Sequence, residues 1–228
     1  MKVTKGIVRT LLCVLTVLAM TTIASASNFT GMGWLVANAL ASNATPATVA
    51  GLGSPDFTFT TSAVAFSSYG NLANTGNGSL DYTVNSFLNS LGSATSITDI
   101  TAGIGTTPLV GPAGNQGFLF EIDGFTSVTN GQTFIVSHDD GLTLTIGTLV
   151  VVNNPGPTAD TVTVGTYTGP TGNFSFQVVY GECCTAPAVL ETDITGPLPT
   201  PGVPEPGSWL LLGAGLLGVG IKRAWRSL

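Results

Sequence analysis

Short runs of alternating apolar and polar residues recur through the middle of the chain, separated by residues that favour turns. A period of two places every second side chain on the same face, so these runs predict β-strands with one buried face. The predicted strands are 57–60, 63–66, 118–122, 133–136, 142–146, 149–152, 161–164, 174–180 and 188–190. The pattern predicts an all-β fold, an antiparallel β-sandwich, formed by one domain at residues 27–195.

Turns are predicted at Asp123-Gly124, Asn130-Gly131, Asp140-Gly141, 153–156 and 169–172, where Gly, Asn, Asp or Pro interrupts the alternation. Between residues 31 and 104 the alternation is weaker. Residues 85–91 in this part fit a short helix or a strand equally well.

The beginning of the chain has the pattern of an export signal. Lys2, Lys5 and Arg9 precede an apolar stretch at residues 10–20, and Ala24 and Ala26 form the small-residue pattern of a cleavage site. Residues 1–26 are therefore predicted to be a signal peptide that signal peptidase removes after Ala26.

The end of the chain combines a proline-rich segment, an apolar run and a basic end. Residues 196–206 predict an extended linker, and residues 207–228 predict a short transmembrane helix with a sorting tail. The apolar run 209–221 has thirteen residues. A helix of that length spans roughly 20 Å, against about 30 Å for the hydrocarbon core, so it is a marginal anchor. Its basic end is expected in the cytoplasm.

This order of features resembles the PEP-CTERM sorting signal of exopolysaccharide-producing bacteria. The residues that carry the resemblance are Pro204, Glu205, Pro206, Lys222, Arg223 and Arg226. It implies processing by an exosortase-type membrane enzyme, with the inner membrane holding the C-terminal helix beforehand and the cell surface or extracellular matrix as destination. The alternative is a plain C-terminal membrane anchor.

Charge is distributed very unevenly along the chain, whose formal net charge is −6. All six lysines and arginines lie within residues 2–9 and 222–226, whereas all twelve acidic residues lie between Asp56 and Glu205. A body without basic side chains cannot grip phosphate groups through them, which excludes nucleic acid as a partner. Its carboxylates must stay solvated or bind cations, and calcium is the natural extracellular candidate.

The second half of the body resembles a PA14-type β-sandwich over residues 117–194. The segments that carry the resemblance are 134–147, with the motif Asp139-Asp140-Gly141, then 167–169, 176–182 and 186–190. In sugar-binding members of that family the paired aspartates hold a calcium ion that also contacts two glycan hydroxyls. The resemblance therefore implies calcium ligation by Asp139 and Asp140, with Glu182 as a further ligand. The alternative is a polar hairpin turn in which Gly141 has a positive φ.

Three other reactive side chains lie close to this motif. Cys183 and Cys184 are adjacent, and an oxidising compartment favours either a bond between them or a cross-link between two chains. Neighbouring Cα atoms are about 3.8 Å apart, below the usual disulfide range. His138 is the single histidine, and the chain has no Gly-x-Ser-x-Gly nucleophile motif, so no enzymatic activity is expected.

Two functions agree with these features. The first is a calcium-dependent carbohydrate-binding or adhesive module associated with extracellular polysaccharide, as in a biofilm. The second is a structural protein of the envelope or matrix without a discrete ligand site.

Overall fold

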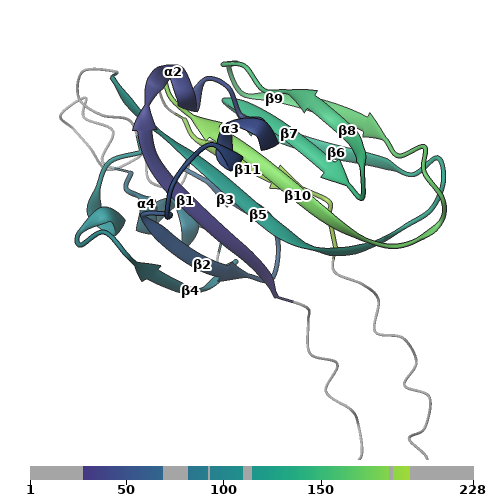
Figure 1. Cartoon of the computed structure of the whole chain (residues 1–228), viewed down its shortest axis with the longest axis horizontal. Helices are drawn as coiled ribbons and strands as arrows, with labels where there is room; N and C mark the ends of the chain where they lie inside the picture. The colour runs from purple at the N-terminus through teal and green to yellow at the C-terminus, as the bar shows by residue number, and fades with distance from the viewer. Residues whose placement is uncertain (1–27, 69–81, 92, 110–114, 185–186, 196–228) are drawn as a thin grey trace, which may run out of the picture.

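Two antiparallel sheets pack face to face, a larger one of seven strands in the order β4-β2-β1-β5-β10-β7-β8 and a smaller one of four in the order β3-β11-β6-β9 (Figure 1). The larger sheet contains β1 (Phe29–Ala37), β2 (Phe57–Thr61), β4 (Ala94–Asp99), β5 (Gln116–Val128), β7 (Gly141–Ile146), β8 (Leu149–Asn154) and β10 (Gly172–Glu182). The smaller sheet contains β3 (Ala65–Ser67), β6 (Thr133–Asp139), β9 (Thr161–Thr166) and β11 (Val189–Thr192). The fold is thus the all-β antiparallel sandwich that the alternation predicts.

The structure, a computed structural model, describes residues 28–68, 82–91, 93–109, 115–184 and 187–195. The predicted signal peptide, linker and sorting tail lie outside these residues. Within them, no helix has the length and apolar character needed to cross a membrane.

Aromatic side chains from both sheets fill the space between them. Phe57 and Phe120 of the larger sheet lie 5.6 Å apart between ring centroids, and Phe66 of the smaller sheet lies 6.0 Å from Phe59. All four side chains are buried. Burying one side chain of this size contributes about 1.5–3 kcal/mol, so these contacts supply much of the stabilisation of the sandwich.

A second, smaller apolar cluster lies on the outer face of the larger sheet. The helices α2 (Asn38–Ala41) and α3 (Pro46–Ala50) cover this face beside β1 and β10 (Figure 1). The buried members of the cluster are Trp34, Ala44, Val49, Leu119 and Val179. The Thr143 hydroxyl of β7 donates to the Ala44 carbonyl at 2.7 Å and helps to fix the helical segment to the sheet.

The strand predictions are confirmed throughout the second half, and all nine predicted runs lie in or overlap β2, β3 and β5 to β11. The predicted turn at Asp123-Gly124 is wrong, because both residues lie within β5. Gly124 is there to leave room for two aromatic rings, since a Cβ at this position would press against Phe29 and Phe176. A glycine required for close packing looks the same in a sequence as a glycine required for a turn.

The weakly patterned first half contains two strands that alternation did not reveal, β1 and β4. Gly31 and Gly33 of β1 carry no side chain because the rings of Phe59 and Phe57 lie across them. Strand β4 has no buried residue, so it shows no apolar face. The ambiguous segment is the helix α4 (Val84–Leu88), which begins with a capping box formed by Thr83 and Ser86.

Gly181 is required where α2 approaches β10, because a Cβ at this position would overlap the carbonyl oxygen of Ala41. We expect Gly181→Ala to lower the free energy of unfolding by about 1–3 kcal/mol. Chemical denaturation measures this. Gly156→Ala is the matched control, since a Cβ at Gly156 meets no atom within 4 Å and φ is not positive there. Equal effects of the two substitutions would contradict the packing described here.

Two carboxyl groups lie side by side on the outer face of β5. Burial, the charge of Glu121 and a hydrogen bond to Glu121 together raise the pKa of Asp123 to about 7. The Gln177 side-chain amide donates to Glu121 at 2.7 Å. The folded protein therefore keeps a proton on Asp123 at a pH where the unfolded chain has lost it.

This pair should make stability fall as pH rises. The contribution of Asp123 is fully present below its unfolded pKa of about 4 and is lost as pH rises through about 7. We expect Asp123→Asn to raise the melting temperature at pH 8 relative to the wild type, and not at pH 4. The gain should stay below about 1 kcal/mol, because solvent screens a half-exposed group. Melting curves at both pH values measure it, and a gain of equal size at pH 4 would refute the shared proton.

Candidate functional site

Asp139 and Asp140 lie where the chain crosses from one sheet to the other. Strand β6 of the smaller sheet ends at Asp139, and β7 of the larger sheet begins at Gly141. The peptide bond between the two aspartates is cis. The alternative of a hairpin turn is therefore wrong, because β6 and β7 do not pair and Gly141 has no positive φ. Gly141 instead leaves room for the backbone of Pro155.

Backbone N–H groups hold the carboxylate of Asp140. Its Oδ2 accepts hydrogen bonds from the N–H groups of Cys183 at 2.9 Å and Cys184 at 3.2 Å. Its Oδ1 accepts one from Thr158 at 3.2 Å. Hydrogen bonds to a charged acceptor are stronger than neutral ones, so they offset the cost of burying this charge. They also fix the loops after β8 and β10 to the crossover.

Asp139 has much less compensation for its charge. Burial and the charge of Asp140 raise the pKa of its carboxyl to about 7, against which a hydrogen bond from the Asp160 backbone acts. At neutral pH its carboxyl group is therefore divided between the protonated and the ionised form. A cation beside it would favour the ionised form.

A surface cavity of about 480 Å³ opens onto these groups. It is lined by Asp139, Asp140, Pro157, Thr158, Ala159, Asp160 and Pro187. Three of these residues are acidic, and the described part of the chain contains no lysine or arginine to oppose them. The cavity is therefore electrostatically suited to a cation.

Asp160 is the acidic residue of this cavity that the sequence did not single out. It precedes β9, and the pairing of β9 with β6 aligns the neighbouring Thr161 with His138. This register places Asp160 at the same cavity as Asp139 and Asp140. Strand alternation alone does not say which strands pair, so the sequence pattern held no signal for it.

Glu182 lies beneath the pair, fully buried at the end of β10. Burial, with the charges of Asp140 and Asp139, raises the pKa of its carboxyl well above the usual value, although hydrogen bonds from Tyr180 and Tyr82 oppose this. The Tyr180 hydroxyl lies 2.8 Å from Oε2 and the Tyr82 hydroxyl lies 3.3 Å from Oε1.

The hydrogen bonds of the Tyr180 hydroxyl bear on whether Glu182 is protonated. The Tyr180 hydroxyl also contacts the carbonyl oxygen of Asp139, and one hydroxyl proton cannot serve both acceptors. A protonated Glu182 resolves this, because it donates to the Tyr180 oxygen while Tyr180 donates to Asp139. The geometry therefore fits a neutral Glu182 that positions the backbone of Asp139.

His138 is also fully engaged in buried hydrogen bonds. Its Nδ1 lies 2.5 Å from the Asp140 carbonyl oxygen, which can only accept, so Nδ1 carries the proton. Its Nε2 lies 2.8 Å from the Thr163 hydroxyl, so both ring nitrogens have hydrogen-bond partners. His138 therefore supports the crossover from the side of the smaller sheet.

Cys183 and Cys184 are joined by a disulfide, with Cys183 buried and Cys184 exposed. The two N–H groups that bind Asp140 belong to this pair. Sγ of Cys183 lies 3.1 Å from the Asp140 carboxylate, but a disulfide sulfur has no proton to donate. It is no thiolate either, so the cluster of Asp140 with these cysteines does not fit a zinc site.

The oxygen atoms of the site fit the calcium ion that the sequence implies. Carboxylate oxygens of Asp139, Asp140 and Glu182 all lie within 4.8 Å of one another. Calcium binds oxygen at about 2.3–2.6 Å, so oxygens up to about 5 Å apart can share one ion. Asp139 and Asp140 also line the open cavity, whereas Glu182 does not.

Comparison with known protein families identifies the tail. The PEP-CTERM protein-sorting motif matches residues 202–224. This range includes Pro204, Glu205, Pro206, Lys222 and Arg223 and ends before Arg226. The sorting signal expected from the sequence is confirmed; it indicates an exported protein and implies an exosortase-type processing partner.

Two solved structures similar to this chain are PA14 domains. The "PA14 sugar-binding domain from RTX adhesin" is 18% identical, with a TM-score of 0.46, over 75% of this chain and 90% of that one. The "PA14 domain of MpAFP Antifreeze protein" is 13% identical, with a TM-score of 0.43, over 77% and 83% of the two chains. None of the curated proteins matches the sequence. The chain thus carries a PEP-CTERM protein-sorting motif C-terminal to an antiparallel β-sandwich.

Proposed function

We propose that this protein is an exported surface module that binds carbohydrate through a calcium ion held by Asp139 and Asp140. The observation that carries the proposal is the cavity onto which Asp139, Asp140 and Asp160 open, in a body without basic side chains. Three acidic groups at one opening repel one another, and a divalent cation relieves that repulsion.

The residues of the site take different parts in this proposal. Asp139 and Asp140 supply ligand oxygens, and Asp160 adds negative charge at the cavity. Glu182 supports the site from below, because its hydrogen bond with Tyr180 orients the Asp139 carbonyl. The backbone N–H groups of Cys183 and Cys184 fix the carboxylate of Asp140.

When bound, calcium supplies a centre whose remaining coordination positions sugar hydroxyls can occupy. Neutral hydroxyls suit this acidic opening, because they add no negative charge to it. The sorting motif indicates an exported protein, and polysaccharide outside the cell presents hydroxyls of this kind. The proposed partner is therefore extracellular polysaccharide, and the proposed role is binding without catalysis.

Calcium should stabilise the folded protein. An ion that binds the folded state alone at a hundred times its dissociation constant adds about 2.7 kcal/mol, which corresponds to roughly 5–10 °C for a domain of this size. We expect a saturable rise in melting temperature with calcium, a smaller rise with magnesium and none with chelator. Differential scanning calorimetry of the protein measures it.

The double variant Asp139→Asn, Asp140→Asn should lose the response to calcium and melt at a lower temperature, because an asparagine at position 140 keeps only one of the two acceptor oxygens. Glu191→Gln is the matched control, because Glu191 is an exposed carboxylate of β11 outside the cavity. A melting temperature that calcium leaves unchanged in the wild type would overturn the calcium site. It would leave a structural role in the matrix as the better account.

Glu182→Gln tests whether Glu182 is a neutral group that supports the site or a charged ligand of calcium. Glutamine matches the size of a protonated glutamic acid and can accept from Tyr82 and donate to Tyr180, so we expect a calcium affinity within about threefold of the wild type. Calorimetric titration with calcium measures it. Glu182→Ala is the contrasting variant, since it removes the carboxyl partner of the buried Tyr82 and Tyr180 hydroxyls, and it should cost about 1–3 kcal/mol of stability. A loss of calcium affinity above about thirtyfold in Glu182→Gln would instead make Glu182 a charged ligand.

A further inference from the structure

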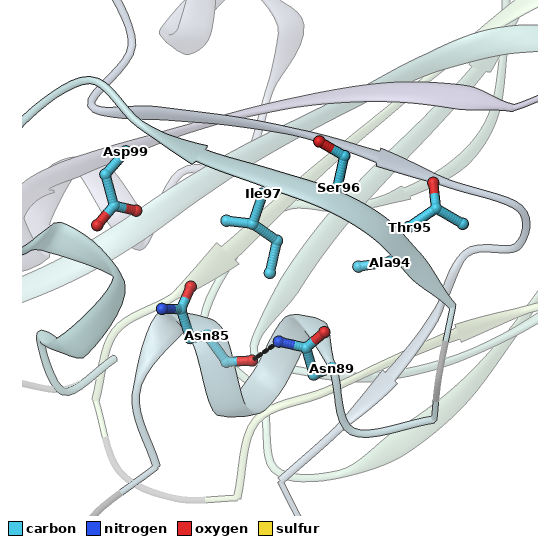
Figure 2. A pocket seen from close by; sticks show the side chains of 7 residues that line it. All are labelled: Asn85, Asn89, Ala94, Thr95, Ser96, Ile97 and Asp99. Carbon is cyan, nitrogen blue, oxygen red and sulfur yellow. Dashed lines mark hydrogen bonds between the residues drawn. The ribbon is translucent and has the colours of Figure 1, made fainter.

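A second cavity lies between helix α4 and strand β4, at the opposite end of the larger sheet from β7 and β8 (Figure 2). Its volume is about 370 Å³, within the range of small-molecule sites in proteins. It is lined by Asn85, Asn89, Ala94, Thr95, Ser96, Ile97 and Asp99. It shares no residue with the cavity at Asp139 and Asp140.

Polar side chains form the accessible lining of this cavity. Asn85 and Asn89 project from α4 toward β4, and Asp99 projects from β4 toward α4 (Figure 2). Ile97 lies between them, but it packs against the core and leaves little apolar surface open to the cavity (Figure 2). Two amides and one carboxylate thus face a single opening.

The amide of Asn85 has hydrogen-bonding capacity that the protein does not use. Its Oδ1 is buried, and among the residues that the structure describes no donor lies within hydrogen-bond distance of it. Gly105 leaves room for the amide, because a Cβ at Gly105 would overlap it. A buried acceptor without a donor costs about 1–3 kcal/mol, so a rotation of the Asn85 side chain that brings Oδ1 to the cavity surface, where a ligand donates to it, is favourable.

Asn89 and Asp99 each make a hydrogen bond within the protein and can make further hydrogen bonds to a ligand. The Asn89 Nδ2 donates to the Asn85 carbonyl oxygen at 2.8 Å, which uses one of its two protons (Figure 2). Oδ2 of Asp99 accepts from the Gly105 N–H at 3.3 Å, and a carboxylate accepts several hydrogen bonds. The cavity therefore offers both acceptors and a donor from positioned side chains.

We propose that this cavity binds a neutral sugar residue without a metal ion. A pyranose has hydroxyls that donate to Asp99 and accept from Asn89, and a further hydroxyl can donate to Asn85 when its Oδ1 turns toward the cavity. An anionic sugar is excluded, because Asp99 repels it and the described residues include no lysine or arginine to bind it. With the site at Asp139 and Asp140, one chain would contact polysaccharide at two places, which increases avidity.

The test is saturation-transfer NMR on the full-length protein with chelator present, so that the calcium site cannot contribute. The probes are the methyl glycosides of glucose, galactose and mannose at millimolar concentration. Methyl glucuronide is the matched negative probe, since it differs from methyl glucoside by one carboxylate. We expect transfer to at least one neutral glycoside, none to the glucuronide, and shifts of the Asn85 and Asn89 side-chain amide signals.

Three variants connect the signal to the cavity. Asp99→Asn keeps an acceptor for the Gly105 N–H and removes the charge, and it should weaken binding about tenfold or more. Asn89→Ala should weaken it severalfold. Glu191→Gln removes an equal charge elsewhere and should have no effect, as should Asp139→Asn with Asp140→Asn.

The outcomes separate this proposal from the calcium-dependent one. The second site is supported if glycoside binding in chelator persists in the Asp139→Asn, Asp140→Asn variant and is lost in Asp99→Asn. This result does not depend on whether calcium binds at Asp139 and Asp140. No transfer to any neutral probe, or transfer that Asp99→Asn and Asn89→Ala leave unchanged, overturns it.

Discussion

The lack of any lysine or arginine between residues 10 and 221 is the constraint on which the rest of this structure depends. A buried carboxylate costs several kcal/mol unless something compensates its charge, and here no side-chain cation can do so. The protein uses other means at each position. Asp140 accepts hydrogen bonds from three backbone N–H groups, the Asp123 carboxyl is hydrogen-bonded to Glu121, and burial raises the pKa of Glu182, which lies between two tyrosine hydroxyls.

Asp139 is the acidic residue whose charge the protein compensates least. It is adjacent to a carboxyl group that accepts three backbone hydrogen bonds, opens onto a cavity with a third acidic group, and has a pKa raised to about 7. The crossover between sheets, the loop of Cys183 and Cys184 and the buried tyrosine pair together hold this group in place. Such rigid support for an incompletely compensated charge is typical of ligand sites rather than of packing, and it is the physical basis of the proposed cation site.

Much of this arrangement was predictable from the sequence, because alternation identifies strands whose two faces differ in burial. Alternation failed at β1, where aromatic rings of β2 cover glycines, and at β4, where no side chain is fully buried. The motif of Asp139 and Asp140 was visible as adjacent acids in a turn-like setting. Asp160 and the cavity at Asn85 were not, since the first depends on the pairing of β9 with β6 and the second on how α4 lies against β4.

Calorimetric titration with calcium at pH 7, repeated in buffers of different ionisation enthalpy, tests the central claim most directly. If calcium replaces the proton that Asp139 partly retains, binding must release protons, about half a proton per ion for a pKa near 7. The account predicts saturable binding whose apparent enthalpy depends on the buffer in the wild type, and none in Asp139→Asn. Binding without proton release, or no binding at all, would contradict it.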